Sequence, residues 1–241
     1  MHEYGAAIKV HPFENHPKQW HAALKAFSVT TPWVVCLDAD QYLSPELYQL
    51  LHQFNSVEIP DAVTGIYFNR KNFFRGKWIR FGGYFPKYML KMFRYGIGYS
   101  DLSEHMDHRF VAPGASLVWK KGYLVEENLK ENAIGFWINK HNRYSDLLAQ
   151  ESFEKDRAAP QKQGLTIWLR GTPDEKIALL KSVWHKLPLY LRPFMYFFYR
   201  YFIRLGFLDG KQGFIFHFLQ AFWFRLLVDI KIEELRKTTK D

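Results

Sequence analysis

Apolar residues along the chain recur at two spacings, one typical of helices and one typical of strands. Helical intervals occur over residues 18–27, 45–54 and 129–152. The second of these segments begins with Ser44 as a helix cap, Pro45 at the first helical position and Glu46 in the first turn. Strand patterns occur over residues 63–70 and 88–93. This succession of elements predicts an α/β protein.

Residues 34–37 form a short, continuous apolar run that leads directly into two carboxylates. Such a run is typical of a central strand of a covered parallel sheet, where ligands bind at the carboxyl ends of the strands. Asp38 and Asp40 would lie at that end. One or two carboxylates are sufficient to hold Mg²⁺ or Mn²⁺ together with the phosphates of a nucleotide. The pair therefore predicts a metal site, and the alternative is a solvated turn after a strand.

The length and composition of the chain are consistent with one large domain or slightly more. The chain has 241 residues, and its single cysteine, Cys36, falls inside the predicted strand, where we expect a buried thiol in a reducing compartment. The first residues lack the pattern of a signal peptide, so export is not indicated. Residues 153–172 are predicted to be a linker between residues 1–152 and a tail, residues 173–241.

The segment from Arg70 to Arg94 carries eight basic residues and no acidic one. Phosphate groups are the natural complement of such a segment. Its aromatic residues could stack on nucleic-acid bases, but no nucleic-acid module is recognisable, so we expect a donor diphosphate or an anionic acceptor and no nucleic acid. The alternative is a solvated basic surface.

The tail is both basic and aromatic. From Lys181 to Asp241 it has 11 Lys/Arg against 5 Asp/Glu, and arginines such as Arg192, Arg200 and Arg204 lie among the aromatic residues. Neither aromatic stretch provides the roughly 18 uninterrupted apolar residues of a spanning helix. The pattern favours helices that lie in a membrane surface, with rings at headgroup depth and arginine reaching anionic lipid. The alternative is packing of the aromatic rings on the sheet domain.

Several segments between residues 3 and 150 share their order and sequence with one enzyme family. They are His11-Pro-Phe-Glu-Asn15, Trp33 to Gln41, Ser44-Pro-Glu-Leu47, Gly65 to Arg70, Phe74 to Arg80, Gly82-Gly-Tyr-Phe-Pro86, Lys91-Met-Phe-Arg94, Leu124 to Lys130 and Asn139 to Tyr144. Together they resemble the family 2 glycosyltransferases, especially bacterial enzymes that extend lipopolysaccharide or other surface polysaccharides. The resemblance implies a partial GT-A nucleotide-diphospho-sugar transferase domain over residues 1–152.

An inverting glycosyltransferase is the function that this resemblance implies. It would move a sugar from a nucleotide-diphospho-sugar to a lipid-linked or polysaccharide acceptor, on the cytoplasmic face of the cell membrane. A carboxylate must take the proton of the acceptor hydroxyl. By order along the chain, Glu104 falls where the family carries its catalytic acidic residue, and Asp101 and Asp107 are neighbours that could replace it. The alternative is an exposed acidic loop.

The same resemblance assigns residues to the donor and the metal, and it has gaps. Lys18, Asp38 and Arg94 are expected to bind the nucleotide-sugar, and Asp38, Asp40 and Glu126 the metal. Relatives often have His where this chain has Glu126, and an acidic residue in place of Gln41. A strand, a helix and a second strand of the family, which precede the segment matching Glu3 to Val10, are also missing, as if the chain began at an internal Met or were truncated.

These gaps keep two alternatives open. The chain could be a degenerate, non-catalytic remnant that binds membranes. It could also be a metal-dependent phosphatase that uses Asp38 as nucleophile and Asp40 as acid, although the Asp-Asp pair typical of such enzymes does not occur.

Overall fold

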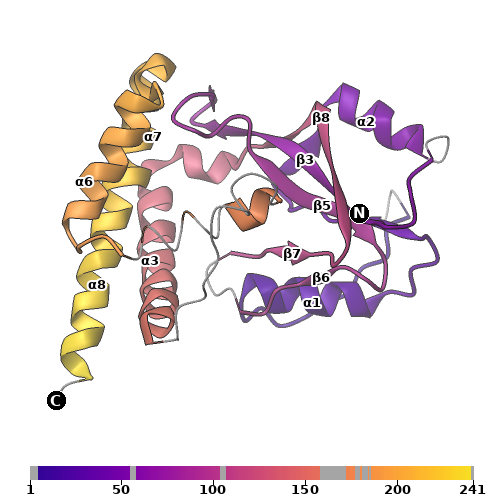
Figure 1. The fold of residues 1–241 in the computed structure, drawn as a ribbon, viewed down its shortest axis with the longest axis horizontal. Coiled ribbons are helices and arrows are strands. Elements are labelled where there is room, and N and C mark those ends of the chain that lie inside the picture. The colour runs from indigo at the N-terminus through magenta and orange to yellow at the C-terminus, as the bar shows by residue number, and fades with distance from the viewer. Residues whose placement is uncertain are drawn as a thin grey trace.

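The computed structural model describes residues 5–54, 58–103, 107–157, 172–176, 180, 184 and 186–239. They form a curled mixed sheet with helices around it and a group of C-terminal helices packed on one side (Figure 1). The strands are β1 (Trp33–Val35), β2 (Gln41–Leu43), β3 (Val63–Phe74), β4 (Lys77–Ile79), β5 (Tyr88–Arg94), β6 (Tyr99–Ser100), β7 (Phe110–Val111) and β8 (Ala115–Glu126). The helices of the first part are α1 (His16–Ala26), α2 (Pro45–His52), the 3-10 turn η3 (Leu129–Asn132) and α3 (Ile134–Arg157).

The sheet has the order β1-β5-β3-β8-β2, and β4 extends it from β3. Strands β3 and β8 are parallel, while β5 runs against both β1 and β3, so β1, β3 and β8 share one direction. Strand β2 is antiparallel to β8. The carboxyl ends of β1 and β8 therefore meet at the same edge of the sheet.

Most of the predicted elements are confirmed. Strands β3 and β5 contain the predicted strand segments, and α1 and α2 cover the predicted helices. At the start of α2, the hydroxyl of Ser44 accepts a hydrogen bond from the Leu47 N–H at 3.3 Å, which is the expected cap. The predicted long helix consists of η3 and α3, and α3 continues to Arg157, past the expected boundary at residue 152.

The prediction of a central parallel strand at residues 34–37 is wrong. Among the described strands, β1 pairs only with β5, and that pairing is antiparallel, so β1 lies at the edge of the sheet. Its side chains nevertheless pack on both faces. Val34 and Cys36 join one core cluster, with Tyr67 and Phe93, while Trp33 and Leu37 join the other. Val35 is 37 % exposed, so one face of the run is covered only in part although every residue in it is apolar.

Two irregularities direct the strands toward the edge where β1 and β8 end. In β5, Met92 pairs with Ile66 and Leu90 with Tyr67, which leaves Lys91 as the extra residue of a β-bulge. In β8, Gly122 has a φ of +71°, and a Cβ there would lie 2.6 Å from the Leu47 nitrogen. The glycine allows β8 to bend around the start of α2.

Helix α3 lies between the sheet and the C-terminal helices (Figure 1). These are α6 (Leu191–Phe198), the π-helical turn η4 (Tyr199–Ile203), the 3-10 turn η5 (Gly206–Asp209), α7 (Gly210–His217), the π-helical turn η6 (Phe218–Trp223) and α8 (Phe224–Thr238). Phe224, Val228 and Ile232 pack on Ala149 of α3. The tail thus contributes to the core of the protein.

The loop before β5 is fixed to the tail by polar contacts and close packing. The backbone N–H groups of Arg80 and Phe81 donate to the Asp209 carboxylate at 3.2 and 2.9 Å. Gly82, with a φ of +66°, approaches the buried ring of His217 so closely that a Cβ would lie 2.1 Å from it. The loop and the tail therefore form a single packed unit.

The C-terminal helices are also more continuous than the sequence indicated. Residues Gly206–Thr238 form one helical segment of 33 residues that is long and apolar enough, by length and composition, to cross a membrane. Of its most apolar stretch, 39 % is buried inside the protein. The expectation that neither aromatic stretch reaches a spanning length is therefore corrected, because α7, η6 and α8 join end to end.

Candidate functional site

Charged side chains gather at the edge where β1 and β8 end. Asp38 and Asp40 follow β1, and Glu126 is the last residue of β8, with Gln41 opposite it in β2. The bulge in β5 brings Lys91 beside them, since its backbone carbonyl accepts from the Cys36 N–H at 2.8 Å. The carboxyl ends of parallel strands are where α/β proteins bind their ligands.

Asp38 is held by a buried lysine. Lys91 Nζ donates to Asp38 Oδ2 at 2.7 Å and lies 3.1 Å from His108 Nε2. The other Asp38 oxygen accepts from the Trp20 indole of α1 at 3.3 Å. The Lys91 side chain is only 1 % exposed, compared with 25 % for Asp38. Asp38 is therefore the counter-charge of a lysine that water barely reaches.

Glu126 is held in a similar way by an arginine. Arg70 Nη1 lies 2.7 Å from Glu126 Oε1, and the Gln41 amide donates to Oε2 at 2.8 Å. Burial raises the pKa of Glu126, but the charge of Arg70 and these hydrogen bonds outweigh it, so the pKa is below its usual range. The amide of Gln41 thus stabilises a charged Glu126.

Within the described residues, no cation forms an ion pair with Asp40. Its Oδ2 accepts from the Asn128 amide at 3.2 Å. Burial, followed by the charges of Glu126 and Asp38, raises its pKa above the usual range for aspartate. Asp40 is therefore more easily protonated than Glu126.

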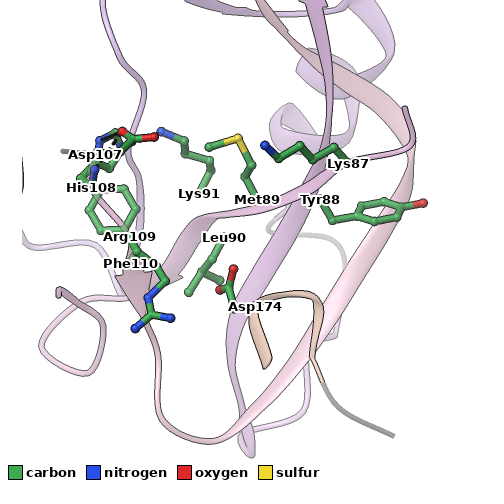
Figure 2. A pocket seen from close by; sticks show the side chains of 10 residues that line it. All are labelled: Lys87, Tyr88, Met89, Leu90, Lys91, Asp107, His108, Arg109, Phe110 and Asp174. Carbon is green, nitrogen blue, oxygen red and sulfur yellow. Dashed lines mark hydrogen bonds and ion pairs between the residues drawn. The ribbon is translucent and has the colours of Figure 1, made fainter. Parts of the chain in front are cut away.

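A cavity of about 140 Å³ lies between β5 and residues 107–110. Lys87, Lys91, Asp107 and His108 line it, and Figure 2 shows Lys91 reaching toward His108 and Asp107 while the hydroxyl of Tyr88 points away. The charge of Arg70, and then burial, lower the pKa of Lys87 to about 7. The Lys87 amine is therefore placed where positive charge is in excess.

The three candidate bases differ in how the structure holds them. Glu104 lies outside the described residues. Asp101 pairs with Arg109 and accepts from Ser103, and these bonds outweigh burial and keep its pKa low, which makes it a weak base. The side chain of Asp107 is 68 % exposed and lines the cavity. Desolvation raises the pKa of Asp107, but its interactions with His108 outweigh this and hold the pKa well below the usual range, so Asp107 is also a weak base.

The structure does not bring Lys18 and Arg94 to this cluster. Lys18 is exposed on α1 and pairs with Glu14 at 2.5 Å. Arg94 ends β5 opposite Trp33, at the start of β1, and its guanidinium donates to the Val63 carbonyl at 2.9 Å. It therefore lies at the opposite end of β1 from Asp38.

The basic segment does not form one exposed surface, since distant residues neutralise part of it. Arg70 pairs with Glu126 and Lys91 with Asp38. The Nζ of Lys71 lies 3.8 Å from the centre of the Tyr123 ring. The charges left available to a ligand are thus fewer than the sequence suggests.

The carboxylates in this arrangement do not fit a divalent metal. Both oxygens of Asp38 and both of Glu126 accept hydrogen bonds from other side chains. Among the described residues, no three His, Cys, Asp or Glu side chains are grouped closely enough to hold an ion. Binding Mg²⁺ or Mn²⁺ would require Asp38 or Glu126 to leave its cation, so the metal stays a prediction.

Sequence reasoning did not single out Lys87, Lys91 or Trp20 for this site. Lys91 lies in β5 among buried residues, and Lys87 directly precedes that strand; a lysine in or beside a buried strand is a signal of a paired or ligand-facing charge. Cys36, expected to be buried, is 4 % exposed, and burial raises the pKa of its thiol to about 12.

Comparison with known proteins gave no match: no family model, no curated protein and no solved structure matches this chain. Any function must therefore be argued from the side chains described above and from the motifs in the sequence.

Proposed function

We propose that the protein is an inverting glycosyltransferase that moves a sugar from a nucleotide-diphospho-sugar to a lipid-linked or polysaccharide acceptor. The observation that carries the proposal is the group of carboxylates and cations at the carboxyl ends of β1 and β8, next to the cavity lined by Lys87 and Asp107. The sequence segments that resemble family 2 glycosyltransferases contribute several of these residues, including Asp38, Asp40 and Glu126.

Transfer with inversion needs a base for the acceptor hydroxyl and positive charge beside the departing diphosphate. Lys87 is suited to the second task, because its amine has no ion pair among the described residues and faces the cavity. Glu104 is our preferred base. Asp107, which lies at the cavity three residues later, is the alternative.

A location at the cytoplasmic face of the cell membrane is part of the proposal. Helix α6 and the turn η4 expose a series of apolar side chains, namely Leu191, Phe194, Met195, Phe198, Tyr199, Phe202 and Ile203. Their spacing of three and four residues places them on one side of the helix. Soluble proteins rarely expose a patch of this kind unless it binds a partner or a membrane. An acceptor carried by a lipid would be encountered at such a surface.

One observation favours a second candidate, a membrane-bound remnant without activity. Two of the three expected metal ligands, Asp38 and Glu126, are already neutralised by Lys91 and Arg70. The phosphatase has less support, because both oxygens of the supposed nucleophile Asp38 are engaged.

The deciding experiment measures donor binding and turnover in the full chain. Binding of uridine, guanosine and thymidine diphospho-sugars is measured by calorimetry, with Mg²⁺, with Mn²⁺ and with chelator, and release of the nucleoside diphosphate is followed. Glu104→Gln should lower turnover by roughly 10²–10⁴ while donor affinity stays nearly intact.

The matched variants are Asp107→Asn and Asp101→Asn. Asp101→Asn should keep near-normal turnover, because Asp101 is already neutralised by Arg109. A loss confined to Asp107→Asn would transfer the role of base to Asp107. If no nucleotide-sugar binds under any of the three conditions, the transferase proposal fails and the remnant is supported.

A further inference from the structure

A second, larger cavity lies between the C-terminal helices and the rest of the protein. Its volume is about 670 Å³, and its walls come from residues 82–88 before β5, from α3, from α6 with η4, and from α8. Pockets that hold small ligands commonly measure about 300–1,000 Å³. The cavity is therefore large enough for the headgroup and first carbons of an amphiphile.

Positive charge dominates the polar lining. Among the residues that the structure describes, six cationic side chains line the cavity, namely Lys87, Lys176, Arg192, Arg200, Arg204 and Arg225, against two carboxylates, Glu151 and Asp229. Asp229 forms an ion pair with Arg192, whose Nε donates to the carboxylate at 2.8 Å. The remaining lining thus has a clear excess of positive charge.

Arg200 carries a buried charge with no carboxylate partner among the described residues, although its guanidinium lies 4.1 Å from the centre of the Tyr84 ring. Its side chain is buried, with the residue only 9 % exposed, and one guanidinium nitrogen donates to the Tyr196 hydroxyl at 2.6 Å. Its Nε has no hydrogen-bond partner within the described part of the chain, and the same holds for the Nε of Arg225. Buried charged donors left unsatisfied are costly, so negative charge placed beside these two guanidinium groups would stabilise the protein.

The other walls of the cavity are apolar. Apolar lining residues are Leu148 of α3, Val228 of α8 and Leu187, which precedes α6. Trp184 also lines the cavity, and the Arg225 guanidinium lies 5.8 Å from the centre of its ring. This combination of basic and apolar walls suits a molecule with an anionic head and a hydrocarbon body.

The rim of the cavity joins the exposed apolar side of α6 and η4. Tyr199 lines the cavity and is also 46 % exposed on that side, next to the exposed Phe198 and Phe202. A hydrocarbon chain could pass from the cavity along these rings into a membrane, where aromatic side chains are favoured at headgroup depth.

We propose that this cavity binds the phosphate headgroup of a membrane amphiphile, with Arg200 and Arg225 holding the phosphate and the chain leaving along α6 and η4. Arginine is suited to this role because its planar fork binds phosphate with two hydrogen bonds. The sequence suggested arginines that reach outward to lipid, whereas Arg192 and Arg200 turn inward. The site goes beyond the proposed transferase and does not depend on its activity.

The test compares two ligands on the full chain by calorimetry. One is dihexanoyl phosphatidic acid below its critical micelle concentration, and the other is inorganic phosphate. Arg225→Gln removes a donor from the cavity, and Arg236→Gln removes the same charge from an exposed position on the same helix, α8. We expect the lipid to bind more tightly than phosphate. Arg225→Gln should weaken lipid binding about tenfold, which is typical of one lost charge-assisted hydrogen bond, and Arg236→Gln should have little effect.

The other outcomes contradict the proposal in distinct ways. Equal binding of phosphate and the lipid would make this a site for free phosphate. Equal losses in Arg225→Gln and Arg236→Gln would show general surface attraction, and absence of binding would show that the cavity is only a packing defect. Should Arg225→Gln unfold, Arg204→Gln serves instead, because Arg204 lines the cavity but is exposed. Donor binding measured in the same samples separates this result from a failure of the transferase proposal.

Discussion

Replacing Asp38 by asparagine tests whether this carboxylate is the counter-charge of Lys91 or an available metal ligand. The substitution keeps the shape of the side chain and removes its charge. Lys91 would then keep its ammonium group 1 % exposed, with only neutral groups beside it: the new amide at position 38 and His108 at 3.1 Å. Removal of one partner of a buried ion pair typically costs about 3–5 kcal/mol, because the other charge stays buried and unpaired.

The structure places the expected cost near the lower limit of that range. Asp38 is 25 % exposed, so water can partly replace the lost carboxylate. We expect Asp38→Asn to lower the free energy of unfolding by about 3 kcal/mol, and the melting temperature by roughly 6–12 °C for a chain of this size. Urea denaturation at pH 7 followed by circular dichroism measures the change.

Three matched variants isolate the pairing. Asp40→Asn should be close to neutral, since Asp40 forms no ion pair with any residue that the structure describes and its pKa is already raised by burial and by Glu126. Lys91→Met should cost less than Asp38→Asn, because the carboxylate left behind reaches solvent. The double variant Asp38→Asn, Lys91→Met should cost clearly less than the two single costs combined. If Asp38→Asn is no more destabilising than Asp40→Asn, Asp38 does not compensate Lys91 and its availability to a metal must be reconsidered.

Three further predictions follow from local geometry. Gly122→Ala should lower the free energy of unfolding by more than about 2 kcal/mol, because it combines backbone strain with a clash against Leu47. Gly76 has a similar φ of +72° but open space around it, so Gly76→Ala should show the cost of the strain alone. Denaturant unfolding of the two variants measures the difference. Burial, with the charge of Arg200, lowers the pKa of His217 to about 3, and burial lowers that of His141 to about 4. The free energy of unfolding should therefore be at its maximum above pH 6.5 and fall on acidification, by about 1.4 kcal/mol per pH unit for each of these histidines. His217→Leu should reduce the slope between pH 6 and 4.5 by about that amount, and an unchanged slope would contradict this. Addition of Mg²⁺ or of a chelator, without nucleotide, should leave the melting temperature unchanged, since Asp38 and Glu126 already have partners. A rise in melting temperature with Mg²⁺ would instead support a site in which these carboxylates bind the metal directly.

Local signals in the sequence were sufficient for the individual elements. Ser44 and Pro45 determine where α2 begins, because the hydroxyl satisfies a free N–H and proline suits the first helical turn. The apolar patterns located β3, β5 and the long helix α3, since side chains that face a core repeat at the period of their element. The two aspartates after β1 were likewise found at the end of a strand.

The lateral order of the strands came only from the tertiary structure. An apolar run predicts side chains that pack on both faces of a strand, and β1 does so at the edge of the sheet, with Val34 on one core cluster and Trp33 on the other, although Val35 is exposed. Hydrogen bonding across the sheet leaves no trace in the period of the side chains, so the sequence could not distinguish an edge from a centre.

The pairing of buried charges was also decided by the tertiary structure. The basic segment has no acidic residue of its own, yet Arg70 finds Glu126 and Lys91 finds Asp38, partners 56 and 53 residues away along the chain. In the tail, Arg192 turns inward to the buried Asp229. The sequence determined which charges exist and which elements carry them. Which charges pair with each other depended on the packing. An unpaired buried charge is costly, and the partner that removes this cost is the opposite charge that the fold brings within reach.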